Sequence, residues 1–152
     1  MKFYLIILFA LVATGCGSNK GVVKLEQFNV DSKEIVIMKD EPTREGVLPI
    51  LVQWFHDNGF SAKVAQSYSE VDPSKYIFSY RAWWGWDIAI YMRRVEMRVR
   101  LKDETLGAID FDSLKYGGFG KFGDSEARLR ILLDVLFGKI TREEADKRLG
   151  EA

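Results

Sequence analysis

The sequence predicts a single α+β domain, with helices packed on one side of a mainly antiparallel sheet. Apolar and polar residues alternate in several short segments in the middle of the chain, which is typical of strands with one buried face. Two longer segments, residues 47–57 and 124–137, repeat their apolar residues at helical spacing. Short turns separate most of the strands, which favours antiparallel pairing. The expected order is β-α-β-β-β-β-α, followed by a short C-terminal helix.

The first fifteen residues have the features of an export signal. Lys2 provides a positive start, an apolar run follows over residues 3–12, and residues 13–15 are small. The apolar run has about ten residues, whereas a membrane-spanning helix needs about 20, so the run is too short for a permanent span. We therefore predict that residues 1–15 form a signal peptide.

The only cysteine of the chain, Cys16, directly follows this segment. The stretch Ala13-Thr14-Gly15-Cys16 resembles the lipobox of bacterial lipoproteins, although Ala13 stands where leucine is commonest. The resemblance implies diacylglyceryl transfer to the Cys16 thiol, cleavage before Cys16, and acylation of the new amino group. In a Gram-negative cell it also implies the outer membrane, because Gly17 rather than an aspartate follows the cysteine. Two alternatives stay open: an uncleaved anchor, or cleavage elsewhere that releases a soluble protein.

Residues 16–31 are expected to form the lipidated cysteine and a flexible tether. Residues 17–21 are small and polar, as in flexible linkers, and residues 22–31 are either linker or a weak edge strand. The globular domain is expected to cover residues 32–138, and residues 139–152 to form the short C-terminal helix. With Cys16 acylated, no thiol remains for a disulfide, so the domain depends on its hydrophobic core.

The first half of the domain predicts strand, helix and strand. Residues 33–39 contain a β-branched run, and residues 60–67 alternate. Between them, Pro49 fits the first turn of a helix, which Asn58-Gly59 would end with a left-handed cap. The three elements together have the size of a split β-α-β unit.

A meander of long strands is expected next. Residues 76–84 alternate, Gly85 is expected to kink or turn the chain, and residues 88–101 continue with a period of two. The alternation slips by one residue at Arg93-Arg94, which predicts a β-bulge there. A turn at residues 102–104 leads into a last strand over residues 105–111.

The C-terminal part predicts a loop and two helices. Residues 115–123 contain four glycines and three aromatic residues, and we expect a mobile loop. Asp124 or Ser125 is expected to cap a helix that ends at Gly138. A second, shorter helix is expected after the capping box of residues 141–144.

The stretch from Tyr80 to Asp87 is the most distinctive local feature, since it holds three tryptophans. It resembles a motif of uncharacterised Gram-negative envelope lipoproteins with a compact α+β domain, a resemblance that implies no activity. We consider a possible ligand platform for sugar or peptide, made by four residues: Trp83, Trp86, Arg81 and Asp87. The alternative, which the sequence favours, is that these aromatic residues fill the core.

Other candidate sites are weak. The glycine-rich residues 117–123 precede a helix but lack the Gly-Lys-Ser/Thr ending of a phosphate-binding loop. His56 is the only histidine and has no partner for catalysis or metal binding. Asp110 and Asp112 could share a strand face, but paired acids also mark strand ends. We predict no catalytic, cofactor or metal site.

The balance of 22 basic and 22 acidic side chains implies no broad positive field, so no nucleic-acid partner is expected. The expected function is that of a lipid-anchored cell-envelope lipoprotein, a non-catalytic structural or interaction module. Its expected partners are the membrane, through the lipid anchor on Cys16, and an envelope protein. A small-ligand or glycan binder that uses the aromatic platform is the alternative, and a cryptic enzyme that uses Asp110 and Asp112 is a third reading.

Overall fold

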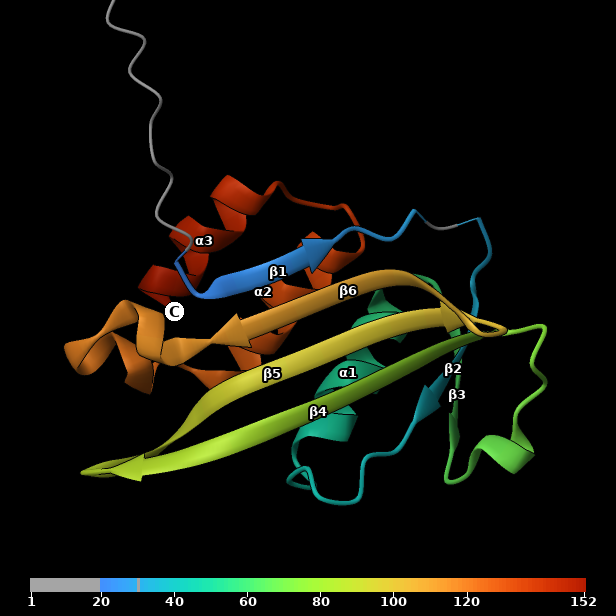
Figure 1. The fold of residues 1–152 in the computed structure, drawn as a ribbon, viewed down its shortest axis with the longest axis horizontal. Coiled ribbons are helices and arrows are strands. Elements are labelled where there is room, and N and C mark those ends of the chain that lie inside the picture. Colours follow the sequence, from blue (N-terminus) through green and yellow to red (C-terminus); the bar gives the residue numbers. More distant parts are fainter. Residues whose placement is uncertain (1–19, 30) are drawn as a thin grey trace, which may run out of the picture.

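The computed structural model describes residues 20–29 and 31–152 (Figure 1). The described part is one α+β domain, in which helices cover one face of a six-stranded sheet. This confirms the fold class predicted from the sequence. The predicted signal peptide and Cys16 lie outside the described residues.

Six strands form the sheet: β1 (Val22–Glu26), β2 (Glu34–Met38), β3 (Ser61–Ala65), β4 (Tyr76–Asp87), β5 (Ala89–Leu101) and β6 (Glu104–Asp112). The described residues also contain three α-helices: α1 (Val47–Asp57), α2 (Ser125–Leu136) and α3 (Arg142–Glu151). The same part of the chain has three short 3-10 helices: η1 (Tyr68–Glu70), η2 (Ser113–Tyr116) and η3 (Gly118–Phe122).

The strand order in the sheet is β1-β6-β5-β4-β2-β3. The pairs among β1, β6, β5 and β4 are antiparallel, whereas β2 pairs in parallel with both β3 and β4. The helix α1 provides the crossover that a parallel β2–β3 pair needs. Because β2 and β3 are direct neighbours, the β-α-β unit is not split.

The N-terminal boundary of the domain differs from the prediction. The domain was expected to begin at residue 32, with residues 22–31 as either linker or a weak edge strand. The structure has the edge strand, because β1 lies in this range and pairs with β6. Val22 is fully buried. Strand β1 has only five residues, and a strand that short depends on a partner far away in the sequence.

The bulge predicted at Arg93-Arg94 is confirmed. Trp83 pairs with Arg94 while the next residue, Trp84, pairs with Met92, so Arg93 is the additional residue. The hairpin turn, however, is not at Gly85, which lies inside β4. It is at Ile88, one residue beyond the end of β4.

The main core lies between the sheet and the helices. On the sheet it contains Phe78, Met97 and Val99, all fully buried. The indole N–H of Trp54 on α1 donates to Asp134 of α2 at 2.9 Å, which ties the two helices together. On the other face of the sheet a smaller apolar cluster consists of Met38, Ala65 and Ile77.

The ends of the C-terminal helices follow the prediction. Asp124 caps α2 by accepting from the backbone N–H of Ala127, and Gly138, with φ of +68°, follows its end. Thr141 caps α3 by accepting from the N–H of Glu144. The segment expected to be a loop, residues 115–123, instead contains the second half of η2 and all of η3.

A buried arginine holds η3 in place. The guanidinium of Arg128 on α2 donates to the main-chain oxygens of Gly120, Lys121 and Ala152, and the residue is fully buried. Burial lowers the pKa of this side chain from its usual value. Arg128 is a charged residue at a helical position between apolar neighbours, which gives no sequence signal of burial. The burial of Arg128 was therefore not predicted.

Candidate functional site

The face of the sheet opposite the helices, called the open face below, carries alternating charged side chains from β4, β5 and β6. Arg98 pairs with Asp110 at 2.6 Å and lies 3.9 Å from Glu96, which also pairs with Arg94. These residues stand on the face that alternation along β5 directs away from the core. Because the charges neutralise one another, the open face is polar without a strong field of either sign.

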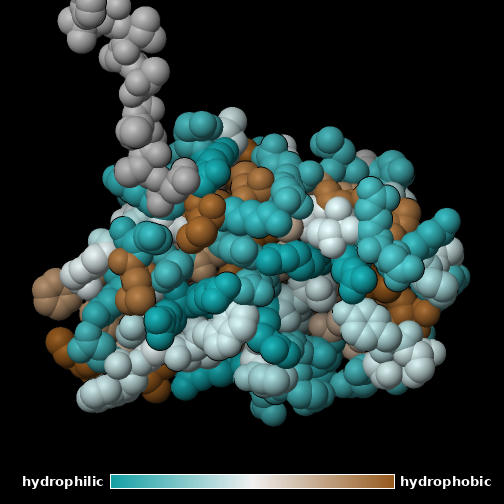
Figure 2. Space-filling model, in the orientation of Figure 1, coloured by the Kyte–Doolittle hydropathy of each residue, from teal (hydrophilic) through white to brown (hydrophobic). Residues whose placement is uncertain are grey.

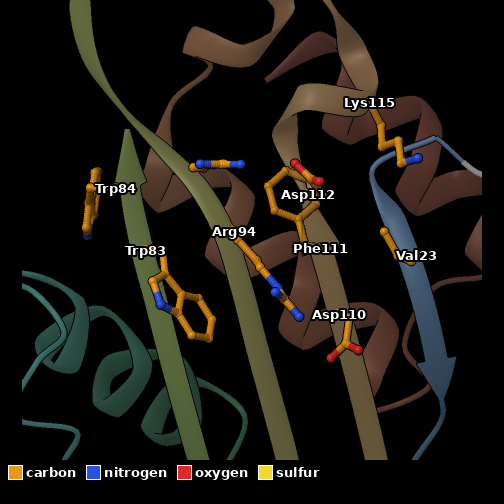
Figure 3. Close-up of a pocket in the computed structure, with 9 residues that line it drawn as sticks. Val23, Trp83, Trp84, Arg94, Asp110, Phe111, Asp112 and Lys115 are labelled. Atoms are coloured by element: carbon orange, nitrogen blue, oxygen red, sulfur yellow. The ribbon is translucent and has the colours of Figure 1, made fainter. Parts of the chain in front are cut away.

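Trp83 of β4 lies on this face and points toward Arg94 (Figure 3). Trp83 is 37% exposed, and the guanidinium carbon of Arg94 on β5 lies 5.2 Å from the centre of the Trp83 ring. The pairing of Trp83 with Arg94 follows directly from the bulge at Arg93, which restores the alternation of β5. Trp83 is therefore a half-exposed aromatic surface beside the Arg94 guanidinium.

Two shallow hollows flank Trp83. The first has a volume of about 560 Å³ and lies over the β1 side, between Trp83, Arg94, Asp110 and Val23 (Figure 3). The second, of about 430 Å³, lies over the β2 side and includes Arg81. Both are depressions on the strand face, so they suit a ligand or protein surface that lies along the sheet.

The second hollow contains a well-ordered ion pair. Arg81 donates from Nε and Nη2 to Asp40, at 3.1 Å and 2.7 Å, and Thr43 donates to the same carboxylate at 2.7 Å. Burial alone would raise the pKa of Asp40, but the hydrogen bonds from Arg81 and Thr43 more than offset burial, so this pKa is lowered. The same Thr43 hydroxyl accepts from the N–H of Ala82, which fixes the loop before α1 against β4.

The four residues of the predicted ligand platform are not brought together. Trp83 and Arg81 share the open face, but Arg81 is engaged by Asp40. Trp86 is three residues from Trp83 on the same strand, so alternation directs the two rings to opposite faces. Asp87 is paired with Lys121 of η3. Of these four residues, only Trp83 remains as a candidate aromatic contact on the open face.

Asp110 and Asp112 do share a strand face, as the sequence suggested, and both line the first hollow. Each also has a structural partner. Asp110 pairs with Arg98, and the Asp112 carboxylate accepts from the N–H of Leu114 and so caps η2. Asp110 therefore has a structural role in an ion pair, and Asp112 has one as a helix cap.

The remaining candidates of the sequence analysis lie apart from the open face. His56 is exposed in the last turn of α1. The glycine-rich residues 117–123 contain η3, and the carbonyls of Gly120 and Lys121 accept hydrogen bonds from Arg128. Within residues 20–29 and 31–152, no group of three or more His, Cys, Asp or Glu side chains is placed to hold a metal ion.

The structure also shows a feature that the sequence analysis missed. The end of the β4–β5 hairpin carries Trp86, Ile88 and Ile90, and Phe119 of η3 lies at the same end of the molecule; we call these four residues the hairpin tip. Their exposed fractions are 77%, 81%, 53% and 84%. The sequence signal that could have indicated this exposed tip is Ile88, which stands at the turn in place of the Gly, Asn or Pro that turns usually contain.

Comparison of the chain with protein-family models, curated proteins and solved structures found no match. Among the helices of the described residues, none has the length and apolarity required to cross a membrane. Cys16 precedes the described residues, so its lipidation stays a prediction.

Proposed function

We propose that this chain is a lipid-anchored cell-envelope protein, held to a bilayer by acyl chains on Cys16, and that its domain is a non-catalytic interaction module. The observation that carries the proposal is the position of the only cysteine, directly after an apolar leader that ends in small residues. In a Gram-negative cell the proposed location is the outer membrane, facing the periplasm.

The position of the first strand supports a short connection between lipid and domain. Val22, the first residue of β1, is fully buried and lies six residues after Cys16. An extended chain of six residues spans at most about 21 Å, so an acylated Cys16 would hold the domain close to the bilayer surface. Proximity of this kind suits a protein that contacts other envelope components.

The composition of the open face supports an interaction role. It combines a half-exposed tryptophan with arginines and carboxylates in two shallow hollows. Tryptophan and arginine are enriched at protein interfaces, and a polar surface around an aromatic centre is typical of non-obligate contacts. We therefore propose the open face, centred on Trp83, as the contact surface.

The anchor is tested by mass spectrometry of the protein extracted from the membrane fraction. The proposal expects a mature chain that begins at Cys16 and carries acyl mass there. A Cys16→Ser variant is expected to lose this mass and to leave the detergent phase on partitioning. An unmodified Cys16 in the wild-type protein would overturn the proposed anchoring.

The contact surface is tested by site-specific photo-crosslinking in intact envelopes. A photoreactive residue replaces Val23, which lines the first hollow and is 48% exposed without a charged partner to disturb. The matched control replaces Gln53, an exposed residue of α1 on the helical side. We expect one discrete adduct at Val23 that is absent at Gln53. Equal labelling at both positions would argue against the open face.

A second candidate function, binding of a glycan or another small ligand, is favoured by the exposed Trp83 ring beside the 560 Å³ hollow. The probe is a series of chito-oligosaccharides, with tryptophan fluorescence as the measurement. If the chain binds such a glycan, we expect saturable quenching of the tryptophan fluorescence in the wild-type protein and loss of this quenching in a Trp83→Phe variant. A flat titration for the wild-type protein would remove it for this class of glycan.

A further inference from the structure

The hairpin tip is the main exposed apolar surface at its end of the molecule. Figure 2 shows brown side chains at the left end of this view, where Figure 1 places the β4–β5 turn. Trp86 pairs directly with Ile90, and both follow the alternation of core residues such as Trp84 and Met92. They are exposed because the hairpin extends past the helices that cover the rest of this face.

The backbone conformation at the turn indicates that Ile88 does not serve to stabilise the fold. Ile88 has φ of +62° and is 81% exposed. A β-branched residue in this left-handed region is unfavourable, and glycine or asparagine would be accommodated better. Its side chain also gains little from burial within the chain. An exposed isoleucine in an unfavourable conformation therefore points to a contact outside the chain.

The hairpin tip lies at the same end of the molecule as the start of the described chain. The backbone N–H of Asp112 donates to the carbonyl of Gly21 at 2.8 Å, and the Tyr116 ring lies against Gly21. From Tyr116 the chain enters η3, whose Lys121 pairs with Asp87 in the hairpin. In Figure 1 the start of β1, the short orange helices after β6 and the hairpin turn all lie in the left part of the domain, β1 at the upper edge of the sheet and the turn at the lower edge.

This arrangement places the tip and the proposed anchor at the same end of the domain, with β6 and β5 between them. Cys16 is four residues before Lys20, which limits the distance between them to about 14 Å. Lys20, Arg93 and Lys115 are exposed. Exposed tryptophan, aliphatic side chains and lysine or arginine are the residues that partition into the headgroup region of a bilayer.

We infer that the hairpin tip inserts into the interfacial region of the phospholipid bilayer that carries the anchor. The inference rests on the lipidation proposed above and adds a second contact with the same membrane. One lipid-modified residue and one inserted hairpin at the same end would restrict how the domain is oriented. The opposite end, which carries η1 and β3, would then face away from the bilayer.

The test uses the protein extracted from membranes and reconstituted into vesicles of phosphatidylethanolamine and phosphatidylglycerol that contain brominated acyl chains. Bromine quenches tryptophan fluorescence only at short range. We expect quenching in the wild-type protein, loss of that quenching in Trp86→Phe, and its retention in Trp83→Phe. Trp83 is the matched control, because it lies on the same strand but on the open face.

A second variant, Ile88→Asn, separates membrane insertion from folding. Asparagine tolerates the left-handed conformation, so the melting temperature is expected to rise by about 2–5 °C. Quenching of Trp86 is expected to fall in the same variant, because the apolar tip is interrupted. The matched control is Val64→Asn, which changes an exposed β-branched residue of β3 at the other end of the sheet and should leave quenching unchanged.

The outcomes distinguish this inference from the proposed anchoring. Acyl mass on Cys16 with an unquenched Trp86 would overturn the inference and leave the anchor intact. Missing acyl mass would overturn the anchor, whereas quenching of Trp86 in the same vesicles would still support insertion of the tip. Unchanged quenching in Ile88→Asn would also overturn the inference.

Discussion

The two halves of the β4–β5 hairpin have similar alternating patterns but opposite surroundings. At its base, Phe78 and Val99 are fully buried under the helices. At its tip, Trp86 and Ile90 continue the same face of the strands and are 77% and 53% exposed. The pattern of a strand is set by the backbone, which directs alternate side chains to one face. Whether that face is buried depends on how far the helices extend over it.

The same apolar alternation therefore has a different consequence at each end of this hairpin. At the base, removal from water stabilises the fold, by about 25 cal/mol for each Å² of apolar surface. At the tip the same residue types remain in water, so they contribute little to folding and are available for a contact.

The largest effect is expected for Phe78→Ala at the base. The Phe78 ring is 5.1 Å from that of Phe55 and is fully buried, so its removal leaves a cavity at the centre of the core. We expect a loss of about 3–5 kcal/mol in the free energy of unfolding. Urea denaturation followed by circular dichroism measures this loss.

The matched change at the tip is Trp86→Ala, for which we expect a loss below about 1 kcal/mol. The side chain is mostly in water in the folded domain, so unfolding exposes little more of it. If Phe78→Ala and Trp86→Ala lost similar stability, the tip would be part of the folded core and the comparison would fail.

An intermediate effect is expected for Arg128→Met, which tests the support of η3 beside the tip. The substitution keeps the length of the side chain but leaves the carbonyls of Gly120 and Lys121 without their donor. We expect a loss of about 2–3 kcal/mol in the free energy of unfolding, measured by urea denaturation.

The control for this variant is Arg130→Met on the same helix. Arg130 forms partly exposed ion pairs with Glu126 and Asp57, which contribute at most about 1 kcal/mol. Equal losses for Arg128→Met and Arg130→Met would show that the buried guanidinium does not hold η3.

The smallest effect at neutral pH is expected for Tyr116→Phe, at the same end of the domain. Burial raises the pKa of Tyr116 to about 12, with a further contribution from Asp146. Below the usual tyrosine pKa of 10.0 the folded and unfolded chains both keep this proton. Above it the unfolded chain loses the proton first, so the contribution to stability falls as pH rises towards about 12.

The Tyr116→Phe variant should therefore lose less stability than the wild-type protein between pH 10 and 12, and should differ little from it at pH 7. Urea denaturation at a series of pH values measures this, and tyrosinate absorbance gives the pKa directly. A Tyr116 that ionises in the folded protein at the usual tyrosine pKa would contradict the prediction.

Local chemistry made much of the fold predictable. The caps at Asp124 and Thr141 and the left-handed glycine at Gly59 are signals contained in a few adjacent residues, and the structure has each of them. The bulge at Arg93 was predictable for the same reason, because a slip in alternation is visible along one strand. The helices and long strands appeared where these signals placed them.

The errors and the open alternatives arose where distant partners decide. Strand β1 depends on β6, so the sequence alone left residues 22–26 as either linker or edge strand. The ligand platform failed because Trp83 and Trp86, close in sequence, lie on opposite faces of β4. Arg128 is buried only because η3 and the C-terminal residues close over it.

The amino-acid order alone was sufficient for the class of fold, the helix ends and the expectation of lipid on Cys16, because each depends on residues within a few positions of one another. The folded arrangement was needed to show which alternating segments the helices cover and which remain in water. Burial is a property of neighbours brought together by the sheet, and the tip, the open face and the buried Arg128 all follow from that packing.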